Sequence, residues 1–149
     1  MLRQTLCAAV VLLFALGVAC TPSRRSSAGF RLPDGDADRG QTAFVALQCN
    51  SCHQVSGVDL PAAPSRFAEP VVLGGRVPRQ ITDGYLTTAI INPSHAIGPF
   101  PLTQVSVQGQ SRMPDYTSGL TARQLADLVA FLQAHYEPYQ PSREYPTYY

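Results

Sequence analysis

The sequence predicts a small all-α domain in which three to five helices are joined by extended loops. A length of 149 residues suits a single domain. The clearest periodic pattern, over residues 120–136, is that of an amphipathic helix with apolar side chains along one face. The 13 prolines and 11 glycines predict many loops and few long elements between the helices.

The charge of the chain is balanced. It carries 11 Lys+Arg against 10 Asp+Glu, all of the basic residues are arginine, and the formal net charge is +1. A general nucleic-acid binder needs a strongly basic surface to displace phosphate counterions, so this class is excluded. A composition that is 45% hydrophobic and nearly neutral also argues against a long disordered chain.

The N-terminal residues 1–19 have the pattern of an export signal peptide. Arg3 provides the positive start, and residues 6–18 form an uncharged apolar run that is too short to span a bilayer. The run ends at Ala19 and Cys20, which resemble the lipobox of bacterial lipoproteins. This resemblance implies cleavage before Cys20 and lipidation of its thiol, with an ordinary secretory signal and an uncleaved anchor as alternatives. Residues 20–35 follow as a flexible tether.

The cysteines point to a covalent cofactor. Cys7 lies in the signal and Cys20 is the expected lipid site, which leaves Cys49 and Cys52, with His53 directly after them. A thioredoxin-like pair needs a βαβ context, and a zinc site usually needs a second cysteine pair; the sequence shows neither. The remaining interpretation is one c-type haem, in which both thiols add to the vinyl groups and the histidine provides a nitrogen ligand to iron.

The mature chain contains one methionine, and we predict that it is the second axial ligand. Met113 lies between Arg112 and Pro114, and the proline restrains the backbone as suits a rigidly held ligand. A thioether stabilises ferrous iron and raises the reduction potential. His95, in a loop, is the main alternative, whereas His135 is expected at the surface near the end of a helix.

Around these residues the chain is similar to the class I c-type cytochromes, the small all-helical electron carriers, over residues 36–136. The resemblance implies a class I cytochrome c fold packed around covalent haem. Two segments depart from it. Residues 98–112 look like an inserted surface loop in which a short hairpin is expected near Val105 and Val107, and the Tyr/Pro-rich tail 137–149 either docks a partner or frays.

The first helix is expected to begin at Asp36, which is a suitable N-cap, and to run towards the cysteine motif. Gly40 and Phe44 lie one turn apart on the same face of this helix. The resemblance implies that this pair crosses the C-terminal helix closely, because glycine has no side chain to block the approach. Phe131 or Leu128 is the expected contact on the other helix.

The middle and C-terminal helices have clear boundary signals. A middle helix is expected over residues 84–91, capped by Asp83 and stopped by Pro93. The C-terminal helix is expected to begin with a capping box formed by Thr121 and Gln124. The side chains expected to cover one haem edge are Tyr85, Leu86, Ala89 and Ile90, and those expected at polar positions of the C-terminal helix are Gln124, Asp127 and Gln133.

Two contacts to the haem site follow from the resemblance. Residues 71–79 resemble the loop that lines the haem propionates. We expect Arg76 or Arg79 to bind a propionate, because guanidinium matches a carboxylate in bidentate fashion. The alternative, with equal weight, is that both are ordinary surface arginines. A proline carbonyl is also expected to accept a hydrogen bond from the second ring nitrogen of His53. Pro64 is the better-spaced candidate for this role and Pro61 is the other.

The leading functional prediction is a monohaem electron carrier, lipid-anchored on the periplasmic side of a bacterial membrane. With both axial positions filled, no small-molecule substrate binds, and the partners are a donor and an acceptor redox protein. One alternative is a haem c subunit of a larger periplasmic dehydrogenase or terminal oxidase complex. Another is a haem sensor or peroxidase with an open sixth position. Since the chain has no lysine, any basic docking face must be built from arginine.

Overall fold

The computed structural model describes residues 30–67, 69–95, 97–98 and 102–137, so the expected signal peptide and most of the tether and tail lie outside the described residues. The chain divides into two units, residues 1–31 and residues 32–149, and the second holds every described element. Within the described residues, no helix combines the length and apolar character that crossing a bilayer requires.

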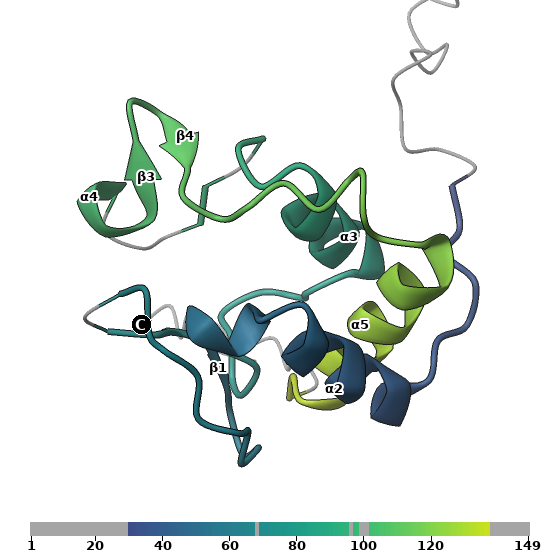
Figure 1. Ribbon diagram of the computed structural model, residues 1–149. Coiled ribbons are helices and arrows are strands. Elements are labelled where there is room, and N and C mark those ends of the chain that lie inside the picture. Colours follow the sequence, from purple (N-terminus) through teal and green to yellow (C-terminus); the bar gives the residue numbers. More distant parts are fainter. Residues whose placement is uncertain (1–29, 68, 96, 99–101, 138–149) are drawn as a thin grey trace, which may run out of the picture. The chain divides into compact units, whose positions relative to one another are not determined.

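Helices make up most of the regular structure, which confirms the mostly helical prediction (Figure 1). Two short two-stranded pairings accompany them. The elements in chain order are α2 (Ala37–Ala46), the 3-10 helix η1 (Cys49–Ser51), β1 (His53–Val55), β2 (Val71–Leu73), α3 (Asp83–Ile91), α4 (Leu102–Val105), β3 (Ser106–Val107), β4 (Gln110–Ser111) and α5 (Ala122–Ala134).

Helix α2 begins as predicted, because the side chain of Asp36 accepts a hydrogen bond from the backbone N–H of Arg39 at 2.9 Å. The helix ends at Ala46 with Leu47 as its C-cap, and Gln48 then adopts a left-handed backbone with φ of 59°. This turn redirects the chain into η1 immediately after the helix. The sequence from cap to turn therefore places the cysteine motif at the C-terminal end of α2.

Helices α2 and α5 pack against each other (Figure 1). At Gly40 the backbone of α5 comes too close to leave room for a side chain. A Cβ atom at Gly40 would lie 2.0 Å from the carbonyl oxygen of Asp127 and 2.6 Å from the Cβ of Phe131. The rings of Phe44 and Phe131 meet edge to face, with centroids 5.5 Å apart. The predicted close crossing is confirmed, and Phe131 is the side chain that meets both residues of the pair.

Helix α5 has the predicted start and an unexpected end. The capping box of Thr121 and Gln124 is present. At the other end His135 is half-buried, not at the surface as expected, with its ring centroid 5.0 Å from that of Phe131. His135 is half-buried because the chain at the end of α5 packs against the segment after β2, where the backbone N–H of Gly75 donates to the carbonyl of His135 at 2.7 Å.

Helix α3 begins one residue earlier than expected and has a different cap. The hydroxyl of Thr82 accepts from the backbone N–H of Tyr85 at 3.1 Å, so Thr82 is the N-cap, and the prediction of Asp83 is wrong. Thr82 has the extended backbone typical of an N-cap, whereas Asp83 is already helical and accepts a hydrogen bond from the Gln133 side chain at 2.9 Å. Pro93 follows the last turn, as predicted.

The two strand pairings organise the remaining segments. Strands β1 and β2 are parallel, with His53 opposite Val71, so the start of the segment expected to be a loop is a strand. Its sequence of two valines and a leucine suits a strand, and the partner strand supplies the pairing. Strands β3 and β4 form the predicted hairpin, with Val107 opposite Gln110.

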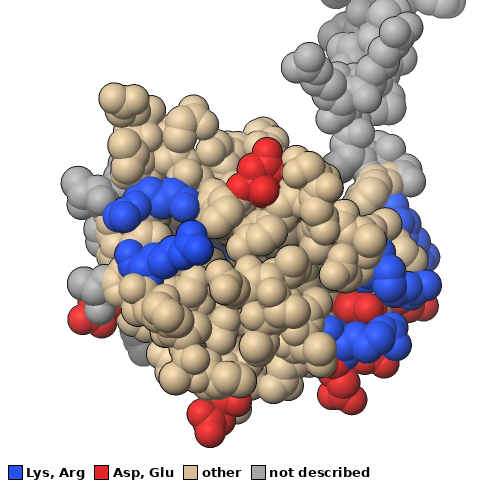
Figure 2. All heavy atoms as spheres, viewed as in Figure 1, with Lys and Arg blue, Asp and Glu red and all other residues tan. Residues whose placement is uncertain are grey.

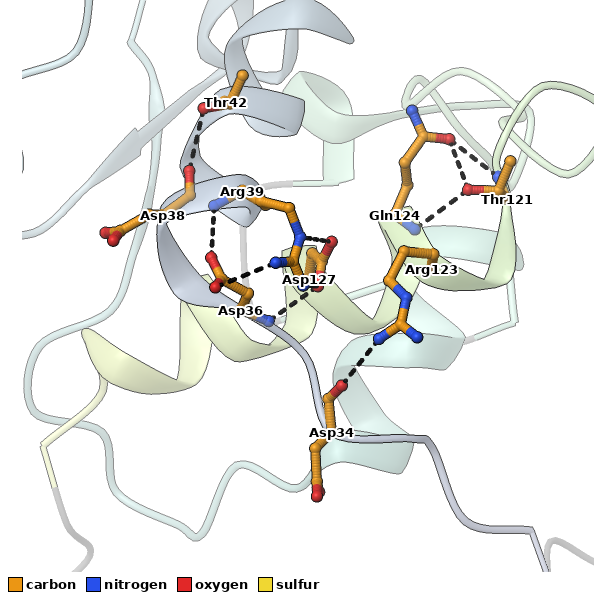
Figure 3. A network of polar contacts seen from close by, with 9 residues as sticks. All are labelled: Asp34, Asp36, Asp38, Arg39, Thr42, Thr121, Arg123, Gln124 and Asp127. Atoms are coloured by element: carbon orange, nitrogen blue, oxygen red, sulfur yellow. Dashed lines mark hydrogen bonds and ion pairs between the residues drawn. The ribbon is translucent and has the colours of Figure 1, made fainter.

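A buried carboxylate in the middle of α5, that of Asp127, ties this helix to the start of α2 (Figure 3). Asp127 was expected at a polar position, but it is only 3% exposed. Arg39 donates to its two oxygens at 2.9 and 3.0 Å, and the backbone N–H of Asp36 donates to one of them at 2.8 Å. The carboxylate is buried because these donors replace its water shell.

This network predicts a pH dependence of stability. The hydrogen bonds from Arg39 hold the pKa of the Asp127 carboxyl below its ordinary value, against the opposing effect of burial. A depressed pKa stabilises the fold above the unfolded value of about 3.9 and loses that contribution as the pH falls through the folded value. We therefore expect Asp127→Asn to be less stable than the parent protein at neutral pH and the difference to shrink towards about pH 3.

Urea unfolding between about pH 7 and about pH 3 measures this difference. Asp59→Asn is the matched control, because Asp59 is exposed and lies outside the network. A difference in the free energy of unfolding between Asp127→Asn and the parent protein that stays constant over the whole pH range would contradict the prediction.

Candidate functional site

A cavity lined mainly by apolar side chains lies between the end of α2, the cysteine motif, the β1–β2 pair, α3 and the segment before α5. Its apolar wall comes from every helix that packs in the core. The apolar residues that line it include Phe44, Leu47, Val71, Val72, Leu73, Val77, Ile81, Leu86, Ala89, Ile90, Ile97, Val105, Leu120, Leu128 and Leu132.

Cys49, Cys52 and His53, the residues predicted to hold the cofactor, all line this cavity. The 3-10 helix η1 holds the two thiols on one turn, and the buried hydroxyl of Ser51 fastens that turn by donating to the Gln48 carbonyl at 2.8 Å. Both cysteines are half-buried and unpaired. Burial raises the pKa of the Cys49 thiol to about 11, with the neighbouring Cys52 adding to the shift against a smaller opposing effect of a backbone hydrogen bond, so the Cys49 sulfur is present as a neutral thiol.

The imidazole of His53 is held in an orientation and a charge state that suit a metal ligand. Its Nδ1 lies 3.3 Å from the carbonyl of Val71, a contact set by the pairing of β1 with β2. Burial lowers the pKa of His53, and the Val71 carbonyl opposes this shift only in part. The ring is therefore neutral at pH 7, and with Nδ1 donating its proton to the carbonyl, Nε2 is the nitrogen that can bind iron.

The partner of His53 differs from the one expected from the sequence. Val71 provides the carbonyl, in place of Pro64 or Pro61. Pro64 is exposed, and the carbonyl of Pro61 instead accepts from the Asn50 side chain at 2.9 Å. The physical reason is the parallel strand pair, which brings the backbone of residue 71 alongside residue 53.

Met113 also lines the cavity, half-buried, with Pro114 beside it. Of the other two ligand candidates, His95 is exposed and His135 packs on Phe131, and neither is among the lining residues. The structure therefore brings two thiols, one imidazole and one thioether to a single cavity. Among the described residues, no three His, Cys, Asp or Glu side chains converge on a common metal site of the zinc type.

The two arginines expected near the propionates have different surroundings. Arg79 lines the cavity and lies over the ring of Tyr85, with its guanidinium carbon 5.1 Å from the ring centroid. Arg76 is not among the lining residues, and its side chain is 88% exposed and paired with Glu137 at 3.0 Å. Tyr85 lines the cavity with the other three residues predicted on α3. The geometry thus favours Arg79 over Arg76 as a ligand to an anionic group.

Among the lining residues that were not anticipated from the sequence are Arg66, Phe67 and Tyr116. Phe67 is covered by Arg112, whose guanidinium carbon is 4.8 Å from the ring centroid, and Tyr116 donates its hydroxyl proton to the Leu47 carbonyl at 3.0 Å. An aromatic residue three positions after the candidate ligand was the one available signal for Tyr116. Within the part of the chain that the structure describes, no Asp or Glu lines the cavity.

Comparison with known proteins gives one match. The family model described as Cytochrome c matches residues 37–135, a range that runs from the first residue of α2 to the C-cap of α5. No curated protein and no solved structure matches the chain.

Proposed function

Because the chain belongs to the cytochrome c family, we propose that it is a monohaem electron carrier, attached by a lipid to the periplasmic side of a bacterial membrane. Membership of the family makes it an electron-transfer protein with covalently bound haem c. The observation that supports a single haem is the convergence of Cys49, Cys52, His53 and Met113 on one cavity. The donor set fits the group: two thiols, a neutral imidazole and a thioether within an apolar wall.

Bound haem c supplies a one-electron ferric/ferrous couple. Cys49 and Cys52 would hold it through thioether bonds, and His53 Nε2 and Met113 Sδ would be the protein ligands to its iron. The Val71 carbonyl orients the imidazole and keeps its second nitrogen protonated. The apolar lining excludes water, and Arg79 is placed to neutralise a propionate.

With both His53 and Met113 bound to the iron, no position would remain for a small-molecule substrate, so the activity we propose is electron transfer between redox proteins and not catalysis. The face on which a partner docks is set by charge. Arg66 lines the cavity and Arg112 lies over Phe67 beside it, and Figure 2 shows basic side chains gathered next to the lobe of α4, β3 and β4. With no carboxylate in the described lining, this face suits a partner that presents acidic side chains.

Membrane attachment rests on the sequence of residues 1–20 and lies outside the described residues. A lipid on Cys20 would confine the haem to the membrane surface through the tether of residues 20–35 and raise its effective concentration near membrane-bound partners. The expected result is that the full-length protein, produced in a bacterium that attaches haem c, is recovered with membranes. Cys20→Ala should move it to the soluble fraction or leave it with an uncleaved signal, with the same visible spectrum.

Redox titration of the membrane-bound protein tests the carrier function in the same preparation. We expect one reversible one-electron transition for one haem, and no rapid binding of carbon monoxide after reduction, because Met113 fills the sixth position. A second transition would contradict the monohaem assignment. Fast carbon monoxide binding would favour the sensor or peroxidase alternative, and an unchanged membrane fraction of Cys20→Ala with normal signal cleavage would contradict the lipid anchor.

One observation favours the second candidate, a haem c subunit of a larger dehydrogenase or oxidase complex. The segment 137–149 carries four tyrosines and three prolines, and aromatic side chains of this kind suit an interface with another subunit. Mild detergent extraction from the native membrane distinguishes the two. A carrier migrates as a single chain, whereas a subunit remains with its enzyme.

A further inference from the structure

We propose that Tyr116 and Ser111 are positioning residues that anchor the segment carrying Met113 on both of its sides and so set how tightly the sixth ligand is held. This inference rests on the proposed role of Met113 as an iron ligand. Residues 112–120 connect β4 to α5 without a helix or strand of their own. Because no regular hydrogen-bond ladder fixes the segment, the position of Met113 depends on contacts made by a few individual side chains.

The upstream anchor is a relay of two serine hydroxyls. The backbone N–H of Met113 donates to the Ser111 hydroxyl at 3.1 Å. The backbone N–H of Ser111 donates in turn to the hydroxyl of Ser94 at 3.0 Å. Ser94 follows Pro93 in the turn after α3, and both serines are half-buried. The relay therefore ties the backbone of Met113 to the end of a core helix that lines the same cavity.

The downstream anchor is the hydroxyl of Tyr116, which donates to the carbonyl of Leu47 at 3.0 Å. Leu47 is the C-cap of α2 and lies two residues before Cys49, so this bond connects the methionine segment to the attachment turn of the cofactor. The last carbonyls of a helix lack partners within the helix, which makes Leu47 a suitable acceptor. The backbone carbonyl of Tyr116 also accepts from Gly119 and Leu120 at 3.1 and 3.0 Å, which fixes the turn that follows.

Met113 thus lies two residues after one anchor and three residues before the other. An external ligand such as imidazole can bind iron only in the fraction of molecules in which the methionine has left. Removing either anchor should increase that fraction, because the bound arrangement loses one net hydrogen bond. Removing the Tyr116 hydroxyl also leaves the carbonyl of Leu47, at the end of α2, without this partner. Loss of a single hydrogen bond of ordinary strength corresponds to a roughly two- to tenfold tighter apparent affinity for imidazole.

The test uses the ferric holoprotein titrated with imidazole, followed by loss of the weak long-wavelength absorption band of methionine-bound ferric haem. Tyr116→Phe keeps the ring and removes only the hydroxyl, and Ser111→Ala removes the acceptor of the Met113 N–H. Both should bind imidazole roughly two- to tenfold more tightly than the parent protein. Thr117→Ala is the matched control and should bind as the parent does, because the exposed Thr117 hydroxyl bonds only within the same segment, to Asp115.

Imidazole affinities of Tyr116→Phe and Ser111→Ala equal to that of the parent protein would overturn the proposal. If Tyr116→Phe does not fold, Ser111→Ala decides the question by the same criterion. A parent protein without the methionine band would contradict the proposed ligand itself, and the proposal with it. This outcome is seen before any variant is made and is therefore distinct from a failure of the anchors alone.

Discussion

Alanine in place of Gly40 should destabilise the domain by about 3 kcal/mol, at the upper end of the usual cost of overpacking a core. In a helix interior alanine is normally favoured over glycine by up to about 1 kcal/mol, so the expected sign depends on the contact between helices. The added Cβ would lie 2.0 Å from the Asp127 carbonyl oxygen and 2.6 Å from the Phe131 Cβ. The obstacle is the backbone of α5, which cannot move without displacing the whole helix.

Thermal unfolding of the holoprotein measures this effect, and the expected fall in Tm is roughly 12–24 °C for a domain of this size. Gly84→Ala is the matched control, since Gly84 also lies in a helix but a Cβ there would meet nothing closer than the Thr82 hydroxyl at 4.0 Å. That variant should be as stable as the parent protein or slightly more stable. A Tm for Gly40→Ala that equals the value for Gly84→Ala would contradict the close crossing of α2 and α5.

Replacing Met113 with alanine should remove the methionine–iron absorption band and lower the midpoint potential by on the order of 0.2 V, within the roughly 0.8 V range that axial ligands span. The reason is that a soft thioether stabilises ferrous iron more than water or a hydroxide ion does. The proposal also predicts rapid carbon monoxide binding by the reduced variant, because the sixth position is no longer filled by the chain. Visible and near-infrared spectra with a redox titration provide both measurements.

Met113→Leu distinguishes ligation from packing, because leucine keeps most of the volume of methionine but has no sulfur. Met113→Leu should lose the methionine–iron absorption band and lower the midpoint potential as much as Met113→Ala does. It should unfold at a higher temperature than Met113→Ala. A parent-like spectrum in either variant would show that another group binds the iron. The only other histidines of the chain are His95, which is exposed, and His135, which packs on Phe131.

Features coded by neighbouring residues were predictable from the sequence. The N-cap at Asp36, the capping box of Thr121 and Gln124, and the Cys49–His53 motif each lie within a few residues, so their chemistry is visible without knowledge of the fold. The helix crossing at Gly40 was also predictable, but only through resemblance to a known family. The structure then identified Phe131 as the contact and gave the distances.

Features coded by residues far apart in the chain were not predictable in this way. The burial of Asp127 depends on Arg39, which is 88 positions away, and Asp127 was therefore indistinguishable from an ordinary polar residue on a helix. The Val71 carbonyl reaches His53 only because β1 and β2 pair in parallel, a pairing with no local signal. The bond from Tyr116 to Leu47 spans 69 positions and depends on the same closed arrangement.

The central claim is that Cys49 and Cys52 hold one haem covalently in this cavity. Mass spectrometry of the denatured protein, after production in a bacterium that attaches haem c, tests this claim most directly. The expected mass is that of the processed chain plus one haem, with neither Cys49 nor Cys52 open to alkylation. A chain without added haem mass, whose two thiols are both alkylated after denaturation, would contradict it.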